Sequence, residues 1–207
     1  MTKLKELFSD TLVYGISSVV ARFIGYLLVP LHTAVFSESQ YGIVTLIFAA
    51  IALFNVVFTM GMESAYIRYA KDRDKAKDIF KTVQLFLLGT SGVLVLLVWI
   101  AEPFVAPTIG LESGDPILWI MLGILFFDTL AVVPFAELRL IRKSVLFAVL
   151  KTGNVVVNLG LNFYLILGLD YGIEAVFISN LVASMLTALV IWIFTIPMFM
   201  GEWNTNL

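Results

Sequence analysis

The sequence predicts an all-α fold, a polytopic bundle of six transmembrane helices in a single domain that covers residues 1–207. Composition is the first reason. The chain is 60% hydrophobic and only 14% charged, with a mean hydropathy of +1.00, whereas soluble domains are about half apolar and a quarter charged. The second reason is the presence of six apolar segments, each near the ~20 residues that cross a bilayer. The third is that basic residues occupy alternate connections between these segments.

The six predicted spans are continuous apolar runs. They must be helical, because a helix satisfies its own backbone hydrogen bonds where no water is present. Ser37 and Gln40 have the spacing of a capping box before the second span. Pro116 is typical of the first turn of a helix. The spans cover approximately residues 11–35, 42–62, 83–101, 116–135, 144–169 and 172–200.

The connections predict the topology, because their charges are segregated. The N-terminus, residues 63–82 and residues 136–143 hold nearly all of the Lys and Arg, while the connections between them carry acidic residues instead. Basic connections stay on the cytoplasmic side. We therefore expect a multi-pass protein of the cell inner (cytoplasmic) membrane. Both termini would be cytoplasmic, and residues 63–82 would form a short cytoplasmic linker.

Several classes of chemistry have no support in the sequence. Cysteine is absent and His32 is the single histidine, so thiolate sites, disulfides and a histidine metal site are excluded. Phosphate-loop, zinc-protease and nucleophile-elbow motifs are also absent. We expect no catalytic residues, no metal, no cofactor and no nucleic-acid partner, and we do not expect an enzyme. The lipid bilayer is the first expected partner.

Polar residues inside the predicted spans indicate a site. Arg22 lies roughly 16 Å into the first span at 1.5 Å per residue, near the bilayer centre. Lys151 in the fifth span is followed at helical spacing by Asn154 and Asn158, and Asp128 lies near the middle of the fourth. Charges in the hydrocarbon often mark pathways. We predict a substrate-binding cavity between the first, second, fourth, fifth and sixth spans, with a net charge of about +1 that favours an anionic head group.

Three structural explanations of the same residues remain open. Arg22 and Asp128 can form a structural ion pair. The asparagine stripe, which continues to Asn162, can join neighbouring helices through hydrogen bonds. The long side chain of Lys151 can reach the cytoplasmic surface while its stem stays in the membrane.

Several segments resemble a known family. Residues 14–42 combine a Gly/Ser-rich first span, Arg22 in mid-helix, the exit Val29-Pro30-Leu31 and a turn at residues 37–42. This pattern resembles the opening of the polysaccharide biosynthesis proteins, the oligosaccharide-lipid flippases of the multidrug/oligosaccharidyl-lipid/polysaccharide exporter superfamily. Similar agreement extends over nearly the whole chain, through residues 61–69, residues 139–143, the Asn-rich fifth span and residues 168–172.

The resemblance implies two six-helix lobes around a central cavity. It also implies the movement of a polyprenyl-pyrophosphate-linked oligosaccharide from the inner to the outer leaflet for surface polysaccharide synthesis. Arg22 matches the family's basic position in the first span, which would hold the pyrophosphate. Family members have about twice as many spans, so the chain resembles the N-terminal half. A second six-helix lobe, or self-association, is the implied partner.

Two alternatives remain beside the flippase lobe. One is an ion-coupled exporter of drugs or of another lipid carrier in the same superfamily. An acidic cation site in the first span would favour it, and the sequence shows none there. The other is a non-transporting membrane scaffold or a truncated fragment. The absence of a second lobe would support this alternative.

Overall fold

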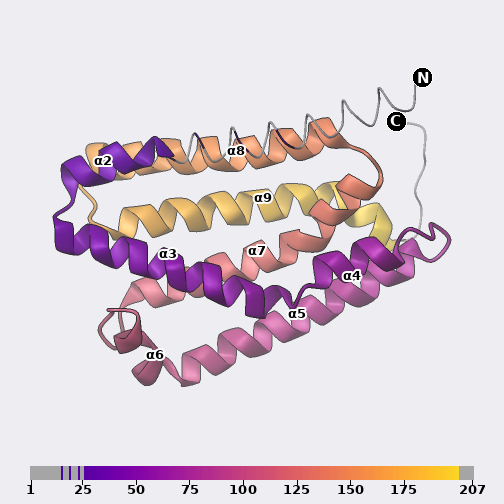
Figure 1. Cartoon of the computed structure of the whole chain (residues 1–207), viewed down its shortest axis with the longest axis horizontal. Coiled ribbons are helices and arrows are strands. Elements are labelled where there is room, and N and C mark those ends of the chain that lie inside the picture. Colours follow the sequence, from indigo (N-terminus) through magenta and orange to yellow (C-terminus); the bar gives the residue numbers. More distant parts are fainter. Residues whose placement is uncertain (1–14, 16–18, 20–22, 24–25, 201–207) are drawn as a thin grey trace.

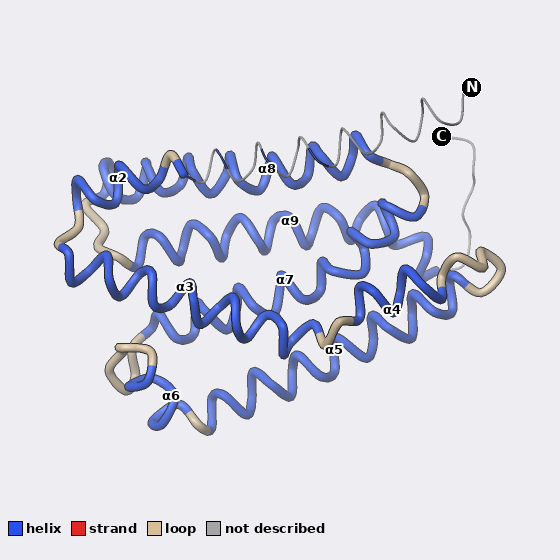
Figure 2. Tube along the Cα trace, in the orientation of Figure 1, coloured by secondary structure: helices blue, strands red, loops and turns tan. Residues whose placement is uncertain are grey.

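Helices make up nearly all of the ordered structure. The computed structural model describes residues 15, 19, 23 and 26–200, and within these residues there are helices and turns but no strand. The long helices lie roughly side by side, and their connections gather at two opposite ends of the bundle (Figures 1 and 2). The elements are α2 (Leu28–Val35), α3 (Glu38–Thr59), α4 (Met62–Tyr69), α5 (Ala76–Ile100), α6 (Glu102–Thr108), α7 (Pro116–Leu140), α8 (Ser144–Phe163), the π-helical turn η1 (Tyr164–Gly168) and α9 (Glu174–Met200).

Five helical segments of the described residues are long and apolar enough to cross a membrane, so the chain is a multi-pass membrane protein. They are residues 38–69, 76–100, 116–140, 144–168 and 174–198. These segments match the second to sixth predicted spans. Most of the predicted first span, residues 11–35, lies outside the described residues, and α2 is its described end. The all-helical membrane fold is confirmed, with five spans described where six were predicted.

The segment predicted as a cytoplasmic linker, residues 63–82, is largely helical. Helix α4 and the first turns of α5 occupy most of it, and only residues 70–75 form a loop. Helix α3 ends where Met60 and Gly61 both adopt the left-handed conformation, at φ of 48° and 65°. Two such residues redirect the chain without a long connection, so helix resumes at once in α4.

The start signals read from the sequence are confirmed. The Ser37 hydroxyl accepts a hydrogen bond from the Gln40 amide N–H, and the Gln40 side chain accepts one from the Ser37 amide. This reciprocal pair satisfies two of the free N–H groups at the start of α3. The Asp115 side chain caps α7 by accepting from the Ile117 N–H at 2.9 Å, and Pro116 occupies the first turn.

A proline inside α7 is accommodated by a side chain from α5. Pro134 has no N–H, so the carbonyl of Leu130, four residues earlier, loses its helical partner. The Gln84 side-chain amide donates to that carbonyl at 2.9 Å, and Gln84 is fully buried. The bond replaces the missing helical one and ties α5 to α7.

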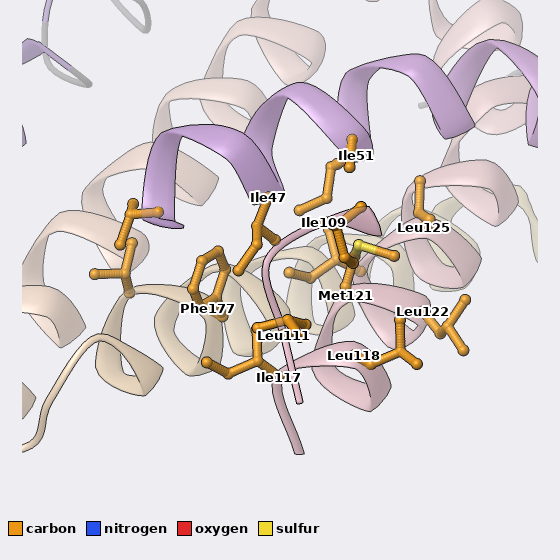
Figure 3. Packing of buried hydrophobic residues seen from close by; sticks show 14 of the residues in the cluster. Ile47, Ile51, Ile109, Leu111, Ile117, Leu118, Met121, Leu122, Leu125 and Phe177 are labelled. Carbon is orange, nitrogen blue, oxygen red and sulfur yellow. The ribbon is translucent and has the colours of Figure 1, made fainter. Parts of the chain in front are cut away.

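Helix α7 lies at the centre of the packing. Each of the three hydrophobic clusters formed by buried residues includes side chains from α7. Figure 3 shows part of the largest cluster, in which side chains from α3, α9 and the segment after α6 pack against the first half of α7. Its labelled members are Ile47, Ile51, Ile109, Leu111, Ile117, Leu118, Met121, Leu122, Leu125 and Phe177. The second half of α7 contributes to the other two clusters and also lines a polar cavity.

Candidate functional site

A cavity of about 410 Å³ opens between α3, α4, α7, α8 and α9. Its lining is mostly polar although the helices that form it are apolar. Four of the five predicted cavity-lining spans contribute, namely the second, fourth, fifth and sixth. The lining residues are Asn55, Glu63, Asp128, Ala131, Val132, Phe135, Arg139, Phe147, Lys151, Asn154, Asn180, Ser184 and Thr187.

Asp128 and Lys151, both predicted as site residues, face this cavity from α7 and α8. The two side chains carry opposite charges, and Ser184 of α9 lines the cavity beside them. The Lys151 Nζ lies 4.3 Å from the centre of the Phe135 ring, a cation–π contact. The side chain therefore lies along the cavity, which leaves it exposed. The alternative in which Lys151 extends to the membrane surface stays a prediction.

A second pair of charges, Glu63 of α4 and Arg139 of α7, lines the cavity toward the end of the bundle that carries the basic connections. The two side chains form an ion pair. The guanidinium carbon of Arg139 also lies 5.9 Å from the centre of the Phe147 ring. The sequence analysis placed both residues in loops and missed them. Glu63 reaches α7 because the chain resumes a helix directly after Gly61.

The two additional charges change the predicted electrostatics. The described lining contains two acidic and two basic side chains, so its formal charge is zero. The predicted charge of about +1 counted Arg22, which lies outside the described residues. The possible ion pair of Arg22 with Asp128 therefore stays a prediction. Within the described lining, the expected excess of positive charge is not present.

Behind Arg139, a buried cluster holds α4 against α7. Glu137 is fully buried and accepts hydrogen bonds from the Tyr66 hydroxyl at 2.6 Å and from both terminal nitrogens of Arg73, at 2.6 and 3.2 Å. The hydrogen bonds to Glu137 raise the pKa of Arg73 above its ordinary value. Because Glu63 and Tyr66 share α4, this cluster fixes the helix that presents Glu63 to the cavity.

The asparagine stripe of α8 divides between two pockets. The Asn154 amide donates to the Thr187 hydroxyl of α9 at 2.9 Å and lines the cavity. Asn158 instead lines a second pocket of about 270 Å³, together with His32. Four residues of helix rise about 6 Å, which separates the two positions along the bundle. In this structure Asn158 does not line the same cavity as Asn154, and its part in substrate binding stays a prediction.

Asn162, one turn beyond Asn158, joins two helices. Its amide nitrogen donates to the Asn158 side-chain oxygen at 2.7 Å. Its own side-chain oxygen lies 3.1 Å from Nε2 of His32 in α2, and both residues are buried. The explanation of the stripe as a link between helices is confirmed for this residue. Asn154 both links α8 to α9 and lines the cavity.

The described residues contain no group of three or more His, Asp or Glu side chains that could hold a metal ion. Comparison with curated proteins gives no match, and comparison with solved structures gives none. A family model described as "Polysaccharide biosynthesis protein" matches residues 33–205, which is most of the chain and includes every helix that lines the cavity. This multi-pass membrane protein, with a polar cavity between its spans, therefore belongs to the polysaccharide biosynthesis protein family.

Proposed function

We propose that the chain is one lobe of a flippase that moves a polyprenyl-pyrophosphate-linked oligosaccharide across the cytoplasmic membrane for surface polysaccharide synthesis. One observation carries the proposal: a chain of this family holds a polar cavity between membrane-spanning helices. The proposed activity is transport and not catalysis.

The physical argument begins with the cost of polarity in a membrane. Ionisable side chains within spans are expensive and usually line a path or a pair. Here Asp128 and Lys151 lie within membrane-spanning helices and face a cavity wide enough for a small molecule. A lipid-linked glycan must move a pyrophosphate and sugars through the hydrocarbon while its tail stays in lipid. A polar cavity beside the bilayer meets that requirement.

We assign roles within this proposal. Lys151 contacts one phosphate of the head group, together with Arg22 from the first span, and Asp128 holds the Lys151 ammonium in place. Asn154 supplies a hydrogen bond from the same face of α8. Asn158 lies in the separate pocket and is not part of this site.

A reconstitution experiment tests the function. The chain is purified with its native membrane partners and placed in vesicles that contain a fluorescent polyprenyl-pyrophosphate-linked sugar. Transfer between leaflets is followed by quenching with a membrane-impermeant reductant. We expect Lys151→Gln to slow transfer about tenfold or more, which corresponds to about 1.4 kcal/mol of lost stabilisation.

The control is Lys71→Gln, which makes the same chemical change in the exposed loop between α4 and α5. It should transfer at the unaltered rate. If wild-type vesicles transfer no faster than protein-free vesicles, the chain is not a flippase under these conditions and the proposal fails. If Lys151→Gln matches Lys71→Gln, Lys151 has no part in the mechanism.

A single lobe of this kind cannot enclose a substrate path by itself, because alternating access moves one helix bundle against another. We therefore propose that the cavity side of α8 and α9 meets a second six-helix lobe or a second copy of the chain. Lys151, whose side chain is exposed within a membrane span, lies on that side. A membrane-permeant crosslinker applied to intact membranes should give a species larger than the 23.0 kDa chain. A product at the size of one chain alone would contradict this arrangement.

A further inference from the structure

We propose that the cavity contains a subsite for an uncharged sugar, built on the side-chain amides of Asn55 in α3 and Asn180 in α9. The inference rests on the proposed function and specifies which part of the head group this cavity binds. Both residues line the cavity, and the sequence analysis included neither among the site residues.

The first argument is that neither amide links two helices in the part of the chain that the structure describes. Within residues 26–200, neither side chain makes a hydrogen bond. The bond recorded at Asn55 is accepted by its backbone carbonyl from Thr59. Asn154, by contrast, has its amide bonded to Thr187. A polar group without a partner is costly in a membrane interior. Two amides that face a cavity in this state are placed to bond a molecule that enters it.

The second argument is the charge of the lining. Glu63 and Arg139 neutralise each other in an ion pair, and Asp128 and Lys151, with opposite charges, line the same cavity. With Lys151 engaged by the phosphate, as proposed above, and Arg139 paired with Glu63, an acidic sugar would meet no further cation among the described lining residues. A sugar whose only polar groups are hydroxyls and amides needs none.

The third argument is the spacing of the amides. Phe48 of α3 and Phe177 of α9 pack with ring centres 5.5 Å apart, and both helices run in the same direction from that contact. Asn180 lies three residues and Asn55 seven residues further along. At 1.5 Å per residue the two amides are staggered by about 6 Å along the bundle, on different helices. This offset along the bundle is close to the length of one sugar ring, so the two amides lie at different depths of the cavity.

The chemistry of the amide fits this ligand. A side-chain amide offers a donor and an acceptor side by side, and a sugar hydroxyl both donates and accepts. Two amides on opposite helices can therefore bond hydroxyls at the two ends of one ring. Hydroxyls of Ser184 and Thr187 lie in the same lining and can extend the network.

The first test uses the unaltered chain, purified with its native partners, and three probes. These are polyprenyl pyrophosphate without sugar, the same carrier with N-acetylglucosamine, and the same carrier with a uronic acid. Affinity is measured by titration in nanodiscs. We expect the neutral-sugar probe to bind about tenfold more tightly than the sugar-free carrier, since hydrogen bonds to the sugar are added. The uronic acid probe should gain less than the neutral one.

The second test uses the variants Asn55→Leu and Asn180→Leu, which keep the size of the side chain and remove its polarity. Each should weaken binding of the neutral-sugar probe about tenfold and change binding of the sugar-free carrier less than twofold. The control is Thr90→Val on α5. Its hydroxyl bonds only the backbone of its own helix, at Phe86 and Leu87, and it does not line the cavity.

The outcomes separate the two proposals. If wild-type protein binds neither the carrier nor its sugar-linked forms, the proposed function fails, and this inference fails with it. If it binds the carrier and the neutral-sugar probe equally, or if the Leu variants weaken both probes alike, the function stands and the sugar subsite is wrong. The comparison of probes on unaltered protein decides the question even if a Leu variant does not fold.

Discussion

At the scale of residues, the contact between Gln84 and the Leu130 carbonyl makes a sharp prediction. The variant Gln84→Leu removes the donor that replaces the helical bond lost at Pro134. It leaves a carbonyl without a partner inside a membrane protein, so we expect it to lower the free energy of unfolding by about 1–2 kcal/mol. Reversible unfolding in mixed detergent micelles measures the change.

The double variant tests the cause. In the background Pro134→Ala, residue 134 can donate to Leu130 itself, so Gln84→Leu should cost little. The two effects would then be strongly non-additive, as for groups that share one bond. An equal cost of Gln84→Leu in both backgrounds would show that its packing, and not this hydrogen bond, stabilises the helix.

The buried carboxylate of Glu137 gives a second prediction. Glu137→Gln keeps the size of the side chain but leaves the Arg73 guanidinium without its charged partner. Because Arg73 is half exposed, we expect a loss of about 2 kcal/mol in unfolding free energy, below the cost of breaking a fully buried pair. Asp72→Asn is the control, since it removes only an exposed contact with Lys75 and should change stability little. Equal effects of the two variants would contradict a structural role for Glu137.

The pH dependence of this pair follows from the raised pKa of Arg73. A cation with a raised pKa in the folded state stabilises the fold below its ordinary pKa and loses that contribution only as pH rises through the higher value. For an arginine this window lies beyond the usable range. We therefore expect the stability difference between wild type and Arg73→Gln to stay constant from neutral to mildly alkaline pH. Unfolding free energies of both proteins, measured at several pH values, provide the check. A decline of the difference within that range would contradict the expectation.

Single residues of the site were predictable where helical spacing alone decides their position. Asp128, Lys151 and Asn154 were expected to line one cavity, and they do, because each faces it from a long, regular span. Glu63 and Arg139 also line it but were not expected to, because a basic stretch suggests a solvated loop. Asn158 lines a different pocket, because residues on one helical face can meet different neighbours at different depths. No periodicity reports which neighbour lies at which depth.

At the scale of elements, the break between α3 and α4 depends on backbone conformation. Gly61 has φ of +65°, and a Cβ there would meet no neighbouring atom within 4 Å. The variant Gly61→Ala therefore isolates the cost of the left-handed conformation, which we expect to be about 1 kcal/mol of unfolding free energy. Gly92→Ala is its matched control, because Gly92 lies within α5 and also has open space around its Cβ position.

The control should move in the opposite direction. An alanine in a helix interior is favoured over glycine by up to about 1 kcal/mol, so Gly92→Ala should be neutral or stabilising. Unfolding curves of the two variants provide the comparison. If Gly61→Ala were also stabilising, the two left-handed residues would not determine where α3 ends.

Element boundaries were predictable where a local signal exists. The Ser37 capping box and Pro116 mark helix starts by bonds that lie within a few residues of sequence. The start of α5 at Ala76 has no side-chain cap and lies in a charged stretch. Tertiary contacts, in which Ala76 and Phe80 pack with Tyr66 and Ala70, extend the helix there. Such contacts leave no local pattern in the sequence.

At the scale of the whole molecule, the alternation of connections predicts opposite exposure of two loops. The sequence has no cysteine, so a single introduced cysteine reports its side of the membrane. We expect Glu112→Cys to react with a membrane-impermeant maleimide in intact cells. Lys71→Cys should react only after the membrane is permeabilised, because basic connections remain cytoplasmic.

Between residues 71 and 112, α5 is the helix that is long enough to cross the membrane. If both cysteines reacted from the same side, α5 would not be a membrane span. If Lys71→Cys reacted in intact cells and Glu112→Cys only after permeabilisation, the proposed orientation would be inverted. The helical fold and the positions of the second to sixth spans were the most predictable properties of the chain, because hydrophobic length acts on whole segments. The packing of the spans around α7 was not predictable, since all of them are apolar.

The central position of α7 has a consequence for synthesis. Helices α3, α4 and α5 are made before it, and α8 and α9 after it, yet every hydrophobic cluster draws on α7. The first helices therefore enter the membrane before their main packing partner exists and wait there in contact with lipid. Helices α4 and α5 can already pack together through Tyr66 and Phe80. The bundle is completed only when residues 116–140 leave the insertion machinery, so a nascent chain arrested earlier would be inserted without its central helix.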